Sequence, residues 1–253
     1  MNWEEYKSLY ELEEHYWWFR GMREIASALL DPIVGPHSLR ALDVGCGTGY
    51  TLPWLRDKYS RSEIVVGLDI SRDALSFSRR RGETSLIQAS VTHLPVANDT
   101  FDLVVSFEVL DWLLPQAAAE AFSELTRVLR PGGLLLVRLP AFQWLYSGHD
   151  RAILTTHRYT RPELVQYLNS SGLIVVRATY VNSLLFPVAA VWRWLNRSQQ
   201  GIRSDVRPLP KGLRWTNSLL EGFLKFEARY LRRFDWSFPV GLSVVAVARK
   251  PTL

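Results

Sequence analysis

Residues 42–50 decide the fold, and they read Leu42-Asp43-Val44-Gly45-Cys46-Gly47-Thr48-Gly49-Tyr50. The apolar run that ends at Val44 indicates a buried parallel strand, and glycines behind such a strand let the turn adopt positive φ and lie against a ligand. Helix-forming sequence resumes at Thr51, which places amide donors and the positive end of a helix beside that ligand. The stretch predicts a site for a nucleotide-type cofactor.

A second apolar run, residues 63–68, ends at Asp69. Two neighbouring parallel strands end at the same edge of a sheet, so this carboxylate can accept hydrogen bonds from both hydroxyls of a ribose. The glycine spacing separates the cofactor classes. A dinucleotide site needs G-x-G-x-x-G, and Tyr50 stands where its third glycine would fall. A nicotinamide oxidoreductase is therefore disfavoured.

The spacing G-x-G-x-G after Asp43 resembles motif I of the class I S-adenosylmethionine methyltransferases, within their type 11, ubiquinone-biosynthesis-like subgroup. Further segments resemble the later motifs of that family in the expected order, namely residues 85–95, 101–108, 127–139 (helix end, Pro-Gly-Gly turn and fifth strand) and 159–181. The resemblance implies an α/β fold with a Rossmann-like, doubly wound sheet of seven strands, the last antiparallel. It also implies S-adenosylmethionine as cofactor and S-adenosylhomocysteine as product.

Motif positions and the resemblance together predict the cofactor-binding residues, which are Asp43, Gly45, Cys46, Gly47, Gly49, Asp69, Ile70, Ser90, Val91 and Phe107. The family often has an acidic residue at the position of Ser90, so the amide of Val91 is expected to carry more of the adenine recognition. By resemblance, Phe107 lends its carbonyl to the cofactor amino group. Arg20 and Arg23 lie one turn apart and can bind the cofactor carboxylate, although their helix can equally pack against the domain.

Composition sets further bounds. A chain of 253 residues with 47% apolar and 22% charged residues can bury one core and a small accessory unit. The single cysteine, Cys46, excludes an internal disulfide framework and a thiolate-rich metal site, and we expect no metal. The N-terminus is acidic and aromatic, unlike a signal peptide, and no apolar run is long enough to span a membrane. We therefore expect a cytoplasmic protein.

The chain divides into an N-terminal helical lid segment (1–30), a cofactor-binding domain (31–181 and 239–253) and a helical insertion between strands six and seven (182–238). The insertion is predicted to hold helices at about 187–197 and 215–233, and the second helix has one apolar stripe at Leu219, Phe223, Phe226 and Tyr230. The net charge is +5, and the excess of basic residues lies in this insertion. It suits a substrate lid that contacts a membrane surface or a lipid-linked phosphate, and a homodimer interface nearly as well. Nucleic acid is not expected as a partner.

Methyl transfer is an in-line displacement that depends mainly on positioning, and a hydroxyl acceptor must also lose a proton. The catalytic candidates are His149 and His157, in the loop after the fifth strand, and Asp111, which follows the fourth strand. Loop hydrogen bonding and helix capping are the respective alternatives. The predicted substrate contacts are Tyr16, Trp18, Glu108, Tyr146 and Tyr159.

The aromatic cluster at residues 16–20, with the segments HDR…HRYT and YVNSLLFP, resembles a bacterial subgroup of natural-product and cell-envelope glycan methyltransferases. We therefore expect methyl transfer to a small or amphiphilic acceptor, at oxygen. A protein that binds the cofactor for regulation, without transferring a methyl group, is the alternative.

Overall fold

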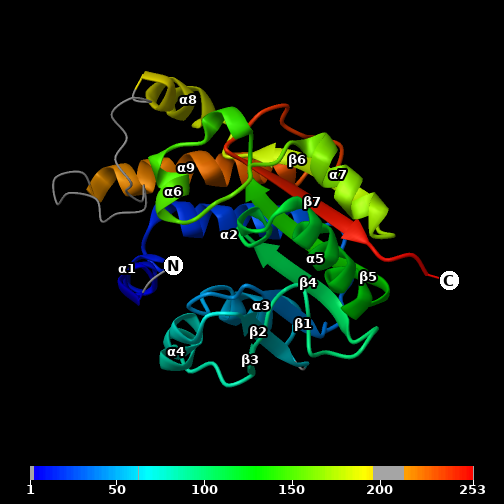
Figure 1. The fold of residues 1–253 in the computed structure, drawn as a ribbon. Coiled ribbons are helices and arrows are strands. Elements are labelled where there is room, and N and C mark those ends of the chain that lie inside the picture. Colours follow the sequence, from blue (N-terminus) through cyan, green and yellow to red (C-terminus); the bar gives the residue numbers. More distant parts are fainter. Residues whose placement is uncertain (1–2, 62, 196–213, 253) are drawn as a thin grey trace.

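A computed structural model of the chain describes residues 3–61, 63–195 and 214–252; of His149, Trp194 and Arg214 it describes only the backbone (Figure 1). Its centre is a seven-stranded sheet in the order β3-β2-β1-β4-β5-β7-β6. The strands are β1 (Ala41–Val44), β2 (Val65–Asp69), β3 (Leu86–Gln88), β4 (Phe101–Phe107), β5 (Leu129–Pro140), β6 (Ile174–Val181) and β7 (Ser243–Arg249). All neighbours pair in parallel except β7, which is antiparallel to both β5 and β6. The predicted doubly wound sheet with an antiparallel last strand is confirmed.

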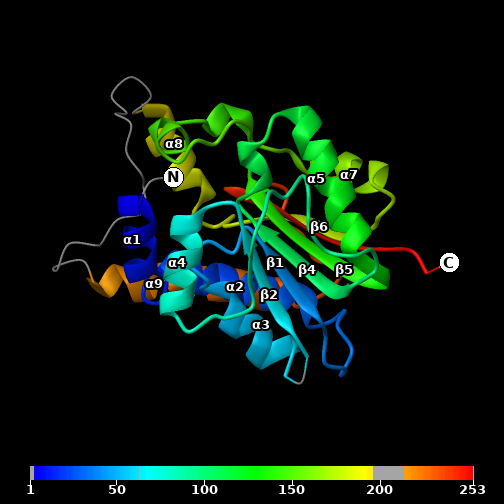
Figure 2. The ribbon, with the colours of Figure 1, turned by 60° about the horizontal axis from the view of Figure 1, so that its bottom comes forward.

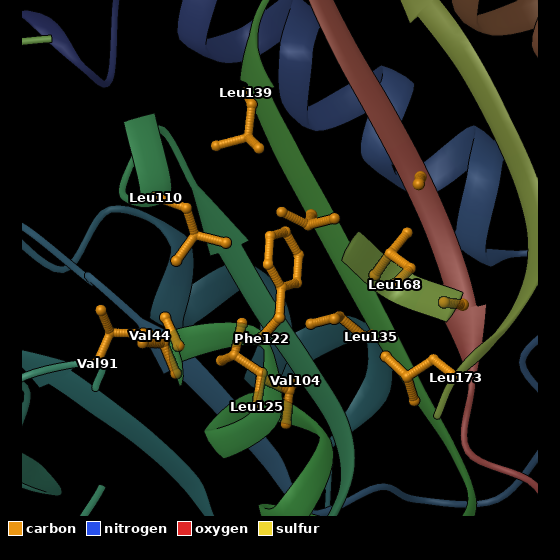
Figure 3. Close-up of a cluster of buried hydrophobic side chains, with 14 of the residues drawn as sticks. Val44, Val91, Val104, Leu110, Phe122, Leu125, Leu135, Leu139, Leu168 and Leu173 are labelled. Carbon is orange, nitrogen blue, oxygen red and sulfur yellow. The ribbon is translucent and has the colours of Figure 1, made fainter. Parts of the chain in front are cut away.

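Helices cover both faces of the sheet (Figure 2). On one face lie α5 (Pro115–Val128) and α7 (Arg161–Ser170), whose Phe122, Leu125 and Leu168 pack against apolar residues of β1, β4 and β5 (Figure 3). On the other face lie α2 (Trp17–Leu30), α3 (Thr51–Tyr59) and α9 (Arg214–Leu231). Both faces of the central strands are thus buried, as expected for parallel strands that read as continuous apolar runs.

The strand register brings the carboxyl ends of the parallel strands to one edge of the sheet. Phe107 of β4 pairs with Arg138 of β5, while Ser243, the first residue of β7, pairs with both Pro140 and Val181. The carboxyl ends of β1, β2, β4, β5 and β6 therefore meet there with the amino end of β7. Neighbouring strands lie about 4.8 Å apart, so the five spacings from β2 to β6 extend over roughly 24 Å. This edge is longer than one cofactor needs.

The fifth strand corrects one detail of the sequence prediction. Residues 131–133 were expected to form a Pro-Gly-Gly turn before the strand, but β5 already begins at Leu129 and includes them. Gly132 has φ of +80°, and the pairing with β4 shifts register between Phe101 and Leu103. The glycines therefore lie in an irregularity within β5, and the strand pairs with β4 both before and after this irregularity.

The insertion contains α8 (Phe186–Leu195) and α9, while residues 196–213, where the connector was predicted, lie outside the described residues. Helix α9 packs on α2 through Leu224. A Cβ added to Gly21 of α2 would lie only 2.4 Å from Cδ1 of Leu224. Part of the predicted apolar stripe of α9 faces solvent instead, since Leu219 is 51% exposed and Phe226 60%, while Tyr230 of that stripe packs against the core. The helix is apolar in two directions, and close approach at Gly21 selects the face that carries Leu224.

The remaining helices complete the cofactor side and the rim. Helix α1 (Trp3–Leu12) packs on α4 (Arg72–Arg80), with the Trp3 and Phe77 ring centroids 4.5 Å apart. Short helices after β4 and β5 form the rim, namely η1 (Leu110–Trp112), η2 (Gln143–Leu145) and α6 (Gly148–Ala152). Within the described ranges, no helix combines the length and the apolar character needed to cross a bilayer.

Candidate active site

A cavity of about 950 Å³ lies along the carboxyl edge of the sheet. Its walls come from the glycine turn after β1, the ends of β2, β4 and β5, the N-terminal segment and helix α8. Ligand pockets commonly measure about 300–1,000 Å³. The cavity therefore has room for a nucleoside cofactor and part of a second molecule.

The glycine turn has the backbone that the sequence predicts, because Gly45, Gly47 and Gly49 have φ of +79°, +54° and +83°. A Cβ on Gly45 would lie 2.1 Å from Val109, and one on Gly49 would lie 2.6 Å from the Ser78 hydroxyl. A Cβ on Gly47 would meet nothing within 4 Å. Gly45 and Gly49 are thus required by packing, while Gly47 exposes backbone to the cavity.

Asp69 joins the end of β2 to this turn. Its Oδ2 accepts a hydrogen bond from the Gly47 amide at 3.0 Å, and its Oδ1 accepts one from the Ser71 amide at 2.8 Å. Burial raises the pKa of this carboxyl, and the two amides oppose the shift. Each oxygen keeps lone-pair capacity toward the cavity, so the predicted ribose contacts are sterically and chemically available.

Asp43 gives the cavity a second carboxylate. Its Oδ2 is buried and has no hydrogen-bond partner among the described residues. Burial raises its pKa to about 8, with the charge of Asp69 as the next cause and Arg138 opposing. A cationic ligand would favour the charged form of both acids. S-adenosylmethionine, which carries a sulfonium and an ammonium, fits this arrangement, and Asp43, Gly47 and Asp69 are the residues that would hold it.

The other residues predicted to bind the cofactor differ in their burial and in their hydrogen bonds. Cys46 is buried and its thiol pKa is raised well above its ordinary value by burial, which suits a small packing residue. The Ser90 hydroxyl lies 2.8 Å from that of Thr92, so it is already engaged locally. Ile70, Ser90, Val91 and Phe107 all line the cavity. Their predicted contacts with the cofactor stay predictions.

The two arginines of the N-terminal segment point to different places. Arg23 lines the cavity, and its guanidinium lies 5.0 Å from the ring centroid of Tyr50. Arg20 instead pairs with Glu221 of α9 at 3.2 Å and does not line the cavity, so its role in binding the cofactor carboxylate stays a prediction. Tyr50, which the sequence argument used only to exclude a dinucleotide, also lines the cavity, and its hydroxyl is buried without a partner among the described residues.

A buried ionic cluster fastens the N-terminal segment to the glycine turn. Glu13 accepts hydrogen bonds from the Thr48 hydroxyl and from Arg81, the latter at 3.0 Å. Arg81 also donates to the carbonyls of Thr48 and Tyr10, at 2.9 and 3.0 Å. The turn and the segment that covers the cavity are thereby held by one arginine.

Glu108 and Arg138 face the cavity beyond the cofactor turn. Glu108 accepts a hydrogen bond from Arg138 Nε at 3.0 Å, and the guanidinium lies 4.9 Å from the ring centroid of Trp18. Burial raises the pKa of Glu108, and Arg138 opposes the shift. Glu108 also has a left-handed backbone, with φ of +56°, which is uncommon for a residue other than glycine and frequent at functional sites. Glu108 and Trp18, both predicted substrate residues, line the cavity, as does Tyr16.

Four other predicted residues of the acceptor side do not line the cavity, namely Asp111, Tyr146, His157 and Tyr159, and their roles in catalysis or substrate binding stay predictions. Asp111 is buried and accepts a hydrogen bond from Thr155, while His157 lies 2.6 Å from Glu163. The hydroxyls of Tyr146 and Tyr159 donate to the carbonyls of Thr155 and Leu110. The contacts of Thr155 with Asp111 and of Tyr159 with Leu110 anchor the loop after β5 to the segment after β4. His149 belongs to α6, and its side chain lies outside the described residues.

The structure adds charged and polar groups that the sequence did not single out. Asp150 and Arg158 form a buried pair at 2.7 Å, in which Arg158 holds the pKa of Asp150 below its ordinary value against burial. Both line the cavity, together with Asn182 at the end of β6. Spacing gave no signal for this pair, although the loop that carries it was identified. Among the described residues there is no cluster of three His, Cys, Asp or Glu side chains that could hold a metal ion.

Comparison with known proteins agrees with this geometry. Residues 42–137 match a family described as a methyltransferase domain. A probable S-adenosylmethionine-dependent methyltransferase of Mycolicibacterium smegmatis is 31% identical over 167 residues, which cover 65% of this chain and 62% of that protein. A malonyl-[acyl-carrier protein] O-methyltransferase of Enterobacter lignolyticus is 35% identical over 114 residues, 45% of this chain and 43% of that protein. The chain thus matches less than two thirds of the length of these relatives.

Among solved structures, a complex between the Haloferax volcanii Trm112 methyltransferase activator and a putative methyltransferase contains a chain that superimposes with a TM-score of 0.62. The match has 18% identity and covers 99% of this chain and 95% of that one, which shows the fold alone. Residues 42–137, which contain the glycine turn and Asp69, thus match a methyltransferase domain, and the chain is similar to S-adenosylmethionine-dependent methyltransferases.

Proposed function

We propose that this protein transfers a methyl group from S-adenosylmethionine to an oxygen atom of a small amphiphilic acceptor. The observation that carries the proposal is one cavity lined both by the glycine turn with Asp69 and by Glu108 with Arg138; the part around Glu108 and Arg138 is called the chamber below. One cavity that holds donor and acceptor side by side is what in-line displacement requires.

Bound S-adenosylmethionine would supply an electrophilic methyl group. The protein's part is to hold the acceptor oxygen in line, to exclude water and to take the proton. Glu108 is our candidate for the group that receives this proton, because it faces the chamber and burial raises its pKa toward the range where a carboxylate is an effective base. Arg138 would keep the carboxylate oriented.

The chamber favours an amphiphile. Its lining beyond Glu108 is mainly apolar and includes Trp112, Leu113, Ile153, Leu185, Val188 and Trp192. The rim helix α8 leaves Val188, Val191 and Leu195 more than half exposed. An apolar chamber with an apolar rim suits an acyl or prenyl chain, such as that of a lipid-linked acceptor.

Relatives support methyl transfer to oxygen only by analogy. The Enterobacter lignolyticus relative is a malonyl-[acyl-carrier protein] O-methyltransferase. That acceptor is small and acidic, and it is carried by another molecule. The proposed pathway class, natural-product or cell-envelope glycan and lipid biosynthesis, fits an acceptor attached to a carrier.

Formation of S-adenosylhomocysteine tests the proposal. The wild-type protein, with methyl-labelled S-adenosylmethionine and a panel of hydroxylated amphiphiles, should produce labelled product and S-adenosylhomocysteine in equal amounts. Glu108→Gln should lower kcat by at least about 100-fold, within the usual range for a general base. Binding of S-adenosylmethionine without turnover on the panel or on lipid extracts would favour a regulatory cofactor-binding protein.

We also propose that α8 and the basic insertion contact anionic membranes. Flotation with vesicles of phosphatidylglycerol and phosphatidylcholine should recover the wild-type protein, and Val191→Glu with Leu195→Glu should abolish recovery. The matched control is Leu219→Glu with Phe226→Glu on the exposed stripe of α9. Loss of a dimer in sedimentation with that second pair, and unchanged flotation with the first, would instead assign these helices to a homodimer.

A further inference from the structure

Asn182 holds a buried, unpaired polar atom beside the far end of the cavity. It directly follows β6, is 2% exposed and lines the cavity, yet its Oδ1 has no hydrogen-bond partner among the described residues. A buried polar atom left unpaired costs about 1–3 kcal/mol, and such atoms in native proteins nearly always have a partner. In a residue that lines a ligand cavity, an atom of this kind points to a ligand that donates a hydrogen bond once the side chain turns toward it.

The backbone around Asn182 is held in place from several directions. Asn182 has φ of +57°, a left-handed conformation that asparagine tolerates better than most residues. The next residue, Ser183, donates from its hydroxyl to the Val240 carbonyl at 2.6 Å. A Cβ on Gly241 would lie 2.3 Å from the Val181 carbonyl oxygen, so the two segments are in direct backbone contact. A strained conformation persists only where its surroundings determine it in this way.

Glu227 of α9 fixes the same turn from below. The side chain of Glu227 is fully buried, and its Oε1 accepts a hydrogen bond from the Leu184 amide at 2.7 Å. Burial raises the pKa of Glu227, and the backbone amides of residues 182–184 oppose the shift. The hydrogen bond from the Leu184 amide ties the turn to the buried carboxylate of α9. The insertion thereby sets the orientation of Asn182.

The position along the sheet separates Asn182 from the cofactor. Asp69 ends β2 and Asn182 follows β6, which are five strand spacings, or roughly 24 Å, apart. Glu108 follows β4, only three spacings, or roughly 14 Å, from Asn182. Pro140, Leu185 and Leu242 line the cavity at this end, and the small polar residue Ser243 lies beside them. A molecule that reaches Asn182 is therefore the acceptor.

We propose that Asn182 is the polar anchor of the acceptor, accepting a hydrogen bond from an uncharged hydroxyl or amide N–H about 14 Å from the methylated atom. The anchor rests on the proposed function, because it lies in the same cavity. An uncharged donor is favoured because a buried charge opposite a neutral amide would lack a counter-charge. The acceptor is thus an elongated molecule with a polar group at each end of an apolar segment.

Two probes of equal length test the anchor, namely decan-1-ol, which donates a hydrogen bond, and 1-methoxynonane, which cannot. Their binding to the protein saturated with S-adenosylhomocysteine is followed by the shift in tryptophan emission as the apolar chain displaces water, since Trp18, Trp112 and Trp192 line the cavity. The wild-type protein should bind the alcohol roughly fivefold more tightly than the ether, the effect of one net hydrogen bond. Asn182→Gly keeps the left-handed backbone, removes the amide and should abolish this preference.

Two further variants make the result decisive. Asp99→Gly changes another left-handed residue, away from the cavity, and should keep the preference for the alcohol. Asn182→Asp retains an acceptor oxygen and adds a charge, so it should bind decylammonium at least tenfold more tightly than the wild-type protein does. Equal affinity of the wild-type protein for alcohol and ether, or a preference that persists in Asn182→Gly, would overturn the anchor. S-adenosylhomocysteine binding is titrated separately, so failure of the cofactor site is distinguished from failure of the anchor.

Discussion

Arg138 of β5 donates a hydrogen bond from Nε to Oε1 of Glu108 at 3.0 Å, inside the cavity that holds the glycine turn. The guanidinium of Arg138 also lies 4.9 and 4.6 Å from the ring centroids of Trp18 and Phe107. One arginine therefore contacts the N-terminal segment, the end of β4 and the proposed base. The acceptor side of the cavity depends on this ion pair.

Breaking that pair should be costly. Arg138→Leu leaves the partly buried Glu108 carboxylate without its partner, and we expect a loss of about 2 kcal/mol in the free energy of unfolding, measured by urea denaturation. Glu108→Gln combined with Arg138→Leu should recover at least a third of that loss, because the uncompensated charge is gone. Strictly additive effects in this double-mutant cycle would mean that the two side chains are not coupled.

Arg23 can be tested for a role in cofactor binding with Arg20, one turn away on the same helix, as the control. Arg23 lines the cavity, so Arg23→Ala should weaken S-adenosylhomocysteine binding at least about tenfold through loss of a charge-assisted hydrogen bond to the carboxylate. Arg20 pairs with Glu221 outside the cavity, so Arg20→Ala should change that affinity less than about twofold. Isothermal titration measures both. The reverse order of effects would show that Arg20 turns into the cavity when cofactor binds.

Asp111 should make stability depend on pH. Burial raises its pKa to about 8, and the charge of Glu108 adds to the shift. Between its ordinary pKa and about 8, the folded protein keeps a proton that the unfolded chain has released, so this group's contribution to stability falls as pH rises. Asp111→Asn cannot titrate, so it does not lose this stability as pH rises. The free energy of unfolding of Asp111→Asn minus that of the wild-type protein should therefore increase by on the order of 3 kcal/mol from pH 5 to pH 8.

Urea denaturation at several pH values checks this expectation. Asp73→Asn, an exposed change in the first turn of α4, is the matched control, and its difference from wild type should stay nearly constant. A difference between Asp111→Asn and wild type that is also independent of pH would contradict the burial of a protonated Asp111.

The cofactor half of the fold could be predicted from sequence because its signals are local. The glycine turn, the apolar run before it and Asp69 lie within thirty residues, and the backbone angles at Gly45, Gly47 and Gly49 are those that only glycine adopts readily. Alternation of apolar runs and helical segments then determines the parallel order of the first five strands. The structure confirms each of these elements.

The acceptor half could not be predicted, because it depends on contacts between distant segments. The Trp17 amide donates to Asn217 of α9, two hundred residues away, and this docking draws Arg20 to Glu221. Similarly, α9 offers two apolar faces, and only the close approach at Gly21 decides which one packs. His157 and Tyr159 lie near the correct edge, but their directions are set by Glu163 and the Leu110 carbonyl. Residue type alone did not reveal these partners.

Titration of S-adenosylmethionine tests the central claim most directly. The wild-type protein should bind it with one site per chain, and Asp69→Ala should weaken binding about 100-fold, because two hydrogen bonds from the ribose to a charged acceptor are lost. Asp73→Ala, four residues along and exposed, should bind as the wild-type protein does. Absence of binding to the wild-type protein, or equal affinity of Asp69→Ala, would contradict the assignment of this cavity to S-adenosylmethionine.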